Sequence, residues 1–251
     1  MEDGILGQFL ADGIKFNDLI IPGRSVESAL SRHVFNLIVN NKDDDFKCYL
    51  AGSATAIRYA GREVLLATQH QISDVELSRV GMLTDSGSHI ITSGGARGYN
   101  SRSDTDAHDI IAFDFTEPCK ARPELKRRFF ALRDVPPEVP NTHVAAVLLS
   151  GCPFSDQVYE IHENNHLGLA RRNFVCRPHS QPSDDALLSV QALRPLEINP
   201  DGMSGGSAFT ILLENEKPKA YFSGLIVRGG NGIFYILKVG YIKAFLDAVF
   251  A

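Results

Sequence analysis

The sequence lacks the charge pattern of proteins that bind nucleic acids or anionic membranes. Its 25 lysines and arginines are outnumbered by 30 aspartates and glutamates, which gives a formal net charge of −5 at pH 7. No global basic field therefore draws the chain to a polyanion. We expect neither a nucleic-acid nor a membrane partner.

Long hydrophobic runs are also missing. No stretch approaches the roughly 20 apolar residues that a membrane-spanning helix needs. The N-terminus, Met1-Glu2-Asp3-Gly4, opens with acids and is not followed by the apolar segment of a secretory signal. These two absences predict an intracellular, cytoplasmic protein.

Cysteine is scarce, and the residues are scattered: Cys48, Cys119, Cys152 and Cys176. None belongs to a C-x-x-C pair of the kind that zinc ribbons and redox sites contain. In a reducing compartment we expect all of them to be free thiols, most of them buried.

What the sequence does contain is a series of short β-type runs separated by Gly, Asn, Asp and Ser. Such spacing is typical of an all-β sandwich or barrel. Helical periodicity is clear mainly at the C-terminus, where Tyr241, Phe245, Leu246 and Phe250 would share one apolar face. The predicted strands cover residues 54–59, 63–68, 110–115, 144–149, 173–176, 187–193, 221–227 and 233–239.

The composition changes between residues 117 and 142, a stretch that holds five prolines and the basic triplet Lys126-Arg127-Arg128. We interpret this stretch as a linker between two β subdomains, and the triplet as a solvated face. The predicted organisation has four parts: an N-terminal segment and first barrel (1–125), a linker (126–142), a second barrel (143–239) and a C-terminal helix (240–251).

The strongest signal for chemistry is Asp201-Gly202-Met203-Ser204-Gly205-Gly206, a serine inside a glycine-rich turn. Glycines let the backbone turn sharply, which would expose the Ser204 hydroxyl and aim the amides of Gly202 and Ser204 at one point. Such an amide pair is an oxyanion hole, which stabilises the negative charge that develops in a transition state. Taken alone, the segment also fits a Gly/Ser-rich hairpin turn.

A nucleophilic serine needs a base, and His70 stands at the end of an apolar strand-like run. The base needs an orienting carboxylate. Asp109 comes immediately before another apolar run, where it would accept a hydrogen bond from the imidazole and fix its tautomer. His70, Asp109 and Ser204 are therefore the candidate catalytic residues, with other aspartates as alternatives for the acid: Asp104, Asp106 and Asp114.

Here the sequence resembles the trypsin-like, chymotrypsin-fold serine peptidases. Gly202-Met203-Ser204-Gly205-Gly206 is similar to that family's G-x-S-G-G turn. Leu66-Ala67-Thr68-Gln69-His70 is similar to its TAxH segment, and Asp109-Ile110-Ile111-Ala112 to its Asp-apolar-Ala segment. The similarity extends to residues 51–57 and 224–227.

The resemblance implies an all-β fold of two antiparallel Greek-key barrels, with the active site in the crevice between them. It implies a serine endopeptidase that hydrolyses a polypeptide substrate and needs neither a cofactor nor a metal. Three residues depart from the secreted members: Met203 replaces Asp, Gln69 replaces Ala, and Thr55 stands where an aromatic residue is common. These departures indicate the intracellular bacterial-type branch.

The family's geometry also implies where substrate binds. The base of the primary pocket would fall near Ile198, with Asn199 beside it. The facing strand would supply the remaining substrate-binding residues: Gly224, Val227 and Gly229. We therefore expect an apolar or small uncharged residue on the acyl side of the cleaved bond.

Met203 stands at a position that, in the resembled family, takes part in activation of the enzyme. In secreted members, the aspartate at this position pairs with an N-terminal amine that proteolysis releases, and the pair sets the oxyanion loop. A thioether cannot form that ion pair, so we expect glycine-rich turn geometry and packing of Met203 to hold the loop without N-terminal processing. Regulation would then act through substrate access or through a protein partner that reorders the loop.

Rival interpretations of the same serine differ in chain order or in chemistry. An α/β-hydrolase needs its histidine after the nucleophile, and the last histidine, His179, precedes Ser204. A subtilisin-type order would need an aspartate ahead of His70 within an alternating α/β chain, which the pattern does not show. A catalytically inactive fold that binds peptides or acts as a scaffold remains the main alternative.

A second motif, His162-Glu163-Asn164-Asn165-His166, matches the H-E-x-x-H of zinc metallopeptidases. On a helix it would place two histidines on one face with a glutamate as base, and a third ligand would have to be Asp184 or Asp185. Asn164-Asn165 favours a turn over a helix interior. We interpret the motif as the tip of a hairpin, and the metallopeptidase as the third hypothesis.

Overall fold

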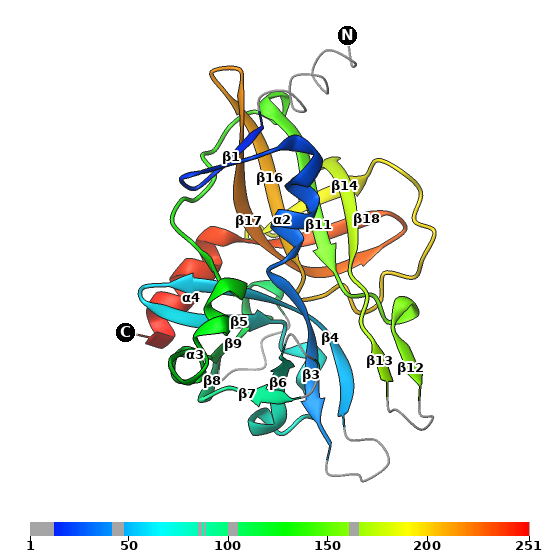
Figure 1. Ribbon diagram of the computed structural model, residues 1–251. Coiled ribbons are helices and arrows are strands. Elements are labelled where there is room, and N and C mark those ends of the chain that lie inside the picture. The colour runs from blue at the N-terminus through cyan, green and yellow to red at the C-terminus, as the bar shows by residue number, and fades with distance from the viewer. Residues whose placement is uncertain are drawn as a thin grey trace.

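The computed structural model describes residues 13–41, 48–84, 87, 89–99, 105–160 and 166–250. Strands dominate, and they form two large sheets that stand one beside the other with the C-terminal helix at their side (Figure 1). All eight strand runs predicted from the sequence are strands here. The prediction of an all-β fold with a C-terminal helix is confirmed.

The first sheet curls into a half-barrel with the strand order β7-β6-β3-β4-β5-β9-β8, and neighbours along this order are antiparallel. Within the described residues its end strands, β7 and β8, do not pair, so this sheet stays open where the resemblance implies a closed barrel. Its strands are β3 (Val34–Asn40), β4 (Cys48–Tyr59), β5 (Arg62–Ala67), β6 (Val80–Leu83), β7 (Ile90–Thr92), β8 (Gly95–Gly98) and β9 (Ile111–Asp114).

The second sheet is a closed barrel. Its six strands follow the order β16-β11-β14-β15-β18-β17, and a further antiparallel pairing of β16 with β17 closes the ring. The strands are β11 (Val144–Gly151), β14 (Arg172–Pro178), β15 (Leu187–Ala192), β16 (Ser207–Glu214), β17 (Lys217–Gly230) and β18 (Ile233–Lys238). Closure leaves none of these six strands with a free edge, which fixes the loops at the ends of the barrel.

Two segments outside the main strand orders pair with the two sheets, and the composition did not indicate either pairing. The N-terminal hairpin, β1 (Ile14–Phe16) and β2 (Leu19–Ile21), joins the second sheet, because β1 pairs in parallel with β17. Within the stretch interpreted as a linker, β10 (Phe130–Ala131) pairs in parallel with β4 of the first sheet.

A buried aromatic group lies where these segments meet. Phe16, Phe130, Phe209 and Phe222 pack with ring centroids 5.0 to 6.1 Å apart, and they come from β1, β10, β16 and β17. Full burial of a phenylalanine side chain stabilises a fold by roughly 1.5–3 kcal/mol. This cluster includes buried residues of both sheets, so it holds the two halves, and the crevice between them, in one arrangement.

The helix α4 (Val239–Phe250) leaves the second barrel and packs against the first half (Figure 1). The Phe245 ring lies 5.1 Å from that of Tyr99. The buried face consists of Val239, Ile242, Phe245 and Leu246, whereas Tyr241 is 43% exposed. The predicted apolar face was therefore wrong at Tyr241, because Ile242 takes its place against the core.

Besides α4, the described residues form two short α-helices, α2 (Val26–Ser31) before β3 and α3 (Thr116–Ala121) after β9. A separate hairpin of β12 (Val158–Glu160) and β13 (His166–Gly168) stands apart from both sheets. Among the described residues, every helix is too short or too polar to cross a bilayer.

Candidate active site

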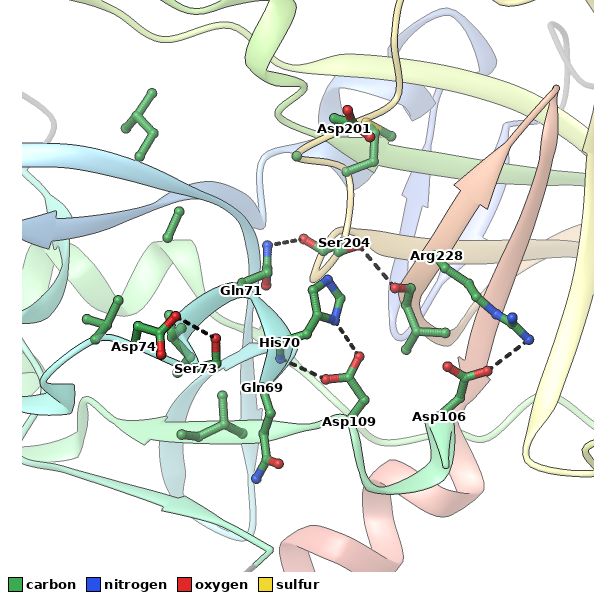
Figure 2. Close-up of a pocket in the computed structure, with 18 of the residues that line it drawn as sticks. Gln69, His70, Gln71, Ser73, Asp74, Asp106, Asp109, Asp201, Ser204 and Arg228 are labelled. Carbon is green, nitrogen blue, oxygen red and sulfur yellow. Dashed lines mark hydrogen bonds and ion pairs between the residues drawn. The ribbon is translucent and has the colours of Figure 1, made fainter. Parts of the chain in front are cut away.

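A cleft of about 1420 Å³ is lined by residues of both halves. His70 and Asp109 reach it from the first half, and Ser204 reaches it from the second. The His70 ring lies between Ser204 and Asp109 (Figure 2). The structure thus brings together the candidates that the sequence analysis selected.

The pairing of two strands places His70 beside Asp109. Ala67, the last residue of β5, pairs with Ile111, the first residue of β9. His70 starts a 3-10 turn just after β5, and Asp109 lies just before β9, so both side chains meet at one edge of the sheet. The strands are anchored by fully buried residues such as Leu65 and Leu66, which leaves this edge little freedom.

The Asp109 carboxylate uses both of its oxygens on His70. Oδ2 accepts a hydrogen bond from His70 Nδ1 at 2.6 Å, and Oδ1 accepts one from the His70 backbone amide at 3.0 Å. Because an ionised carboxylate can only accept, Nδ1 carries the proton and Nε2 is the free nitrogen. Asp109 is therefore the acid that contacts His70; Asp106 pairs with Arg228 and Asp114 with Arg62, while Asp104 lies outside the described residues.

The hydrogen bond from Nδ1 to Asp109 raises the pKa of His70 above its ordinary value, against an opposing effect of burial. The Asp109 side chain is 18% exposed and that of His70 is 52% exposed. The imidazole thus remains open to the cleft, while its carboxylate partner is less exposed. This arrangement stabilises a protonated imidazole, the form that a base takes after it accepts a proton.

Ser204 is not hydrogen-bonded to His70. Its Oγ donates to the carbonyl oxygen of Val227 at 3.0 Å (Figure 2). The structure therefore contains one of the two side-chain links of a catalytic triad, between Asp109 and His70. The second link requires the Ser204 hydroxyl to turn away from Val227.

The backbone around Ser204 is held at every carbonyl from residue 201 to residue 205. Two of these bonds orient the amides proposed as oxyanion donors. The Asp201 carbonyl accepts from the Phe154 amide at 2.8 Å, and the Met203 carbonyl accepts from the Gly206 amide at 2.9 Å. In a trans peptide N–H and C=O point in opposite directions, so the amides of Gly202 and Ser204 face away from these partners. Within the described part of the chain, neither amide has an acceptor.

The other carbonyls of the loop are held by the first half. Ser53 of β4 donates from its hydroxyl to the Gly202 carbonyl at 2.6 Å and from its amide to the Ser204 carbonyl at 3.2 Å. Its hydroxyl also accepts from the Cys152 amide at 2.7 Å. Thr55 Oγ1 donates to the Gly205 carbonyl at 2.9 Å. Strand β4 thus serves as a template for the conformation of the nucleophile loop.

Burial and glycine geometry complete this loop. The Met203 side chain is buried among residues of the second barrel, as the sequence analysis expected of a residue that packs instead of forming an ion pair. Gly205 has a φ of +81°, and a Cβ there would lie 2.1 Å from the Ser53 carbonyl oxygen. Only glycine fits at this position, because any side chain would push β4 away from the loop.

The expected substrate-binding residues are only partly found at the cleft. Val227 and Gly229 line it, but Ile198, Asn199 and Gly224 are not among its lining residues. Asn199 is exposed and its carboxamide donates to Asp201 at 2.9 Å. Gly224 is buried in the barrel wall, where β17 pairs with β16 on one side and β18 on the other.

Sequence reasoning missed an ion pair that crosses the cleft. Arg228 of β17 contacts Asp106 of the first half at 3.0 Å, and both residues line the cleft (Figure 2). Burial raises the pKa of Asp106, while the Arg228 guanidinium partly offsets that effect. The pair lies in the same cleft as Asp109. No motif marks it, since the two residues are far apart in the sequence.

The cysteines and the zinc-type motif lie outside this chemistry. All four cysteines are free, and burial raises the pKa of Cys152 and Cys176 to about 12, far from the range of a reactive thiolate. His166 begins strand β13, while His162 and Glu163 lie outside the described residues. Among the described residues, no group of three His, Cys, Asp or Glu side chains is placed to hold a metal.

Comparisons with known proteins identify the fold. No model of a known protein family and no curated protein matches the sequence. Among solved structures, the thermostable serine protease AL20 from an extremophilic microorganism is similar with a TM-score of 0.53 and 11% identity, over 89% of this chain and 99% of that one. The inactive form of the Rv3671c protease is similar with a TM-score of 0.50 and 14% identity, over 91% of this chain and 94% of that one. The chain therefore has the chymotrypsin-like fold of serine proteases.

Proposed function

We propose that this protein is a serine endopeptidase. His70 would take the proton from Ser204 as its Oγ attacks the carbonyl carbon of a peptide bond, and would then give that proton to the leaving amine. Asp109 would hold the imidazole in the tautomer that leaves Nε2 free. The amides of Gly202 and Ser204 would donate to the oxyanion of the tetrahedral intermediate.

The observation that carries this proposal is the orientation of the nucleophile loop. Both peptide planes that would supply oxyanion donors are fixed by hydrogen bonds on their carbonyl side. A surface turn with no chemistry gains nothing from two amides without acceptors, because such groups cost free energy once they are shielded from water. A pair of preset donors is useful when a negative charge develops opposite them.

In the proposed mechanism the Ser204 side chain would turn about its Cα–Cβ bond, and Oγ would leave the Val227 carbonyl for His70. The lost hydrogen bond is worth roughly 0.5–1.5 kcal/mol, so this step is a minor barrier. We expect a substrate whose backbone pairs with β17 to favour the rotation by competing for that carbonyl.

A catalytically inactive, peptide-binding fold is the second candidate. The observation that favours it is the hydrogen bond between Ser204 and Val227, which leaves the nucleophile without its base. The zinc hypothesis is weaker, because His166 lies on a strand and the spacing H-E-x-x-H aligns its ligands only on a helix.

We also propose a cytoplasmic location. The four free thiols favour a reducing compartment, which agrees with this location.

A hydrolysis assay separates these candidates. The protein is incubated with unfolded casein, new amino termini are counted, and parallel samples contain a sulfonyl fluoride or EDTA. We expect cleavage that the sulfonyl fluoride abolishes and EDTA leaves unchanged. Cleavage stopped only by EDTA would support the zinc hypothesis, and peptide binding without cleavage would support the inactive fold.

A further inference from the structure

Gln71, the residue after the candidate base, has a side chain that turns back toward the nucleophile loop (Figure 2). Its Nε2 donates to the Ser204 carbonyl at 2.6 Å and to the Ser53 carbonyl at 3.3 Å. Its Oε1 accepts from the Thr68 amide at 3.0 Å and from the Thr68 hydroxyl at 2.8 Å. One carboxamide therefore joins the end of β5, strand β4 and the nucleophile loop.

The orientation of this carboxamide is settled by its partners. A backbone amide can only donate, so the group that faces Thr68 must be the oxygen. The nitrogen then faces two carbonyl oxygens, and each of its two protons has an acceptor. Both donors and both oxygen lone pairs are used, so the side chain has a single satisfied position.

The Gln71 carboxamide fits beside the backbone only because two neighbouring residues are glycines. A Cβ on Gly52 would lie 2.1 Å from Gln71 Nε2, and a Cβ on Gly205 would lie 2.9 Å from Gln71 Oε1. A glycine on β4 and a glycine in the nucleophile loop thus form the two walls of the space that the carboxamide fills. The shape of the site, as well as its hydrogen bonds, is fitted to Gln71.

We propose that Gln71 is a positioning residue that couples the candidate base to the nucleophile loop by holding the Ser204 carbonyl. This inference rests on the proposed function and extends it. His70 and Ser204 lie on different halves of the molecule, and Gln71 is a direct link between the residue beside one and the backbone of the other. Its carboxamide fixes the peptide plane that follows Ser204, which limits the positions available to Oγ and to the Ser204 amide.

Two variants with nearly the same shape test the proposal. Gln71→Met keeps the length of the side chain and removes all four hydrogen bonds. Gln71→Glu keeps an oxygen for Thr68 and sets a second oxygen against the carbonyls of Ser204 and Ser53. We expect kcat for a peptide ester to fall about 10- to 100-fold in Gln71→Met and further in Gln71→Glu, with KM within about threefold. Direct loss of an oxyanion donor costs roughly 10²- to 10³-fold, and an indirect effect should be smaller.

The control is Thr210→Val, which removes a buried hydroxyl pair with Ser223 inside the second barrel. It should lower the melting temperature without changing kcat. A peptide aldehyde adds a second readout, because its adduct with Ser204 places an oxyanion between the two amides. Its affinity should fall in Gln71→Met by about the same factor as kcat/KM. Equal kcat in Gln71→Met and the wild type, or equal losses in Gln71→Met and Thr210→Val, would overturn the proposal.

Amide hydrogen exchange keeps the test independent of activity. The amides of Met203, Gly205 and Gly206 are all hydrogen-bonded within or next to the loop. In Gln71→Met they should exchange at least tenfold faster, while amides of β15 and β18 stay unchanged. If the wild-type protein hydrolyses nothing, the proposed function fails and the exchange result still decides whether Gln71 holds the loop. Unchanged exchange would refute the positioning role.

Discussion

The two halves of the site are built by different means. In the second half, the nucleophile loop has each of five successive carbonyls hydrogen-bonded, and the side chain of Met203 is buried. In the first half, one side-chain pair defines the geometry, and His70 is half exposed to the cleft. The backbone of the nucleophile loop is therefore held by hydrogen bonds, whereas the proposed mechanism still requires the Ser204 side chain to turn toward His70.

This contrast separates two kinds of contribution to catalysis. The loop would supply electrostatic stabilisation through groups that need no rearrangement during the reaction. The His70–Asp109 pair would supply proton transfer, which depends on a tautomer and a pKa. Changes to the pair should therefore alter rate and pH dependence, and changes to the loop should alter rate alone.

The largest expected effect comes from the proposed nucleophile, on which both halves of the site would act. Ser204→Ala should fold normally and should lower hydrolysis about 10⁴-fold or more, because the covalent route is lost while the oxyanion donors remain. Initial rates on a peptide ester measure this effect. Activity within tenfold of the wild type would show that Ser204 is not the nucleophile.

Asp109→Asn tests the side-chain half alone. An asparagine can offer its NH₂ group to Nδ1 and so favour the wrong imidazole tautomer, which lowers kcat about 10⁴-fold in sites of this type. The melting temperature should change little, since the pair lies at the surface of the cleft. A much greater loss in Asp106→Asn than in Asp109→Asn would move the acid to the other aspartate.

Sequence patterns selected three residues that the fold brings to one cleft, but they did not indicate the framework that holds these residues. His70, Asp109 and Ser204 each stand next to an apolar strand in a short motif, and local patterns of that kind are readable. Gln71 and Arg228 have no such motif, because their roles depend on contacts with residues more than a hundred positions away. The same reason explains why no pattern indicated the place of β1: a parallel pairing with the distant strand β17 leaves no local signal.

The sequence patterns do not predict strand β3, which shows a second limit of this approach. Val34–Asn40 is mostly apolar, and periodicity cannot distinguish a buried strand of this kind from a helix segment. The substrate-binding residues show another limit. Ile198 and Asn199 are implied by family geometry alone; neither lines the cleft, and the Asn199 carboxamide donates to Asp201. Their part in substrate binding stays a prediction.

Ser53→Ala tests the hydrogen bonds that hold the nucleophile loop, apart from the His70–Asp109 pair. It removes the hydroxyl that joins the Gly202 carbonyl to the Cys152 amide. We expect kcat to fall about 10- to 100-fold with the pH profile unchanged, which is less than the effect of removing a direct oxyanion donor. Ser189→Ala, a buried serine of β15 that donates to the Ser180 carbonyl, is the matched control and should keep full activity. A shifted pH profile in Ser53→Ala would contradict the separation of the two halves.

The pH dependence of hydrolysis tests the His70–Asp109 pair separately from the nucleophile loop. The bond to Asp109 raises the pKa of His70 above the ordinary value of 6.5, and only the neutral imidazole acts as a base. The acidic limb of kcat/KM should therefore have its midpoint above pH 6.5. In Asp109→Asn the residual activity should keep its plateau to lower pH, because the cause of the raised pKa is gone. An unshifted midpoint would show that another group controls this limb.

Arg228→Gln should give the smallest effect. The ion pair with Asp106 is partly exposed, and such pairs contribute roughly 0–1 kcal/mol. Since both residues line the cleft, we expect KM for peptides to change by less than about fivefold and kcat to stay constant.

The central claim is that the nucleophile loop is preset in the chain as it stands. The most direct measurement treats the full-length protein with a fluorophosphonate and reads both the intact mass and the labelled residue. We predict one adduct, on Ser204, in protein whose N-terminus is untrimmed, and much slower labelling in Asp109→Asn. Labelling that begins only after the N-terminus is trimmed, or that maps to another residue, would contradict the claim.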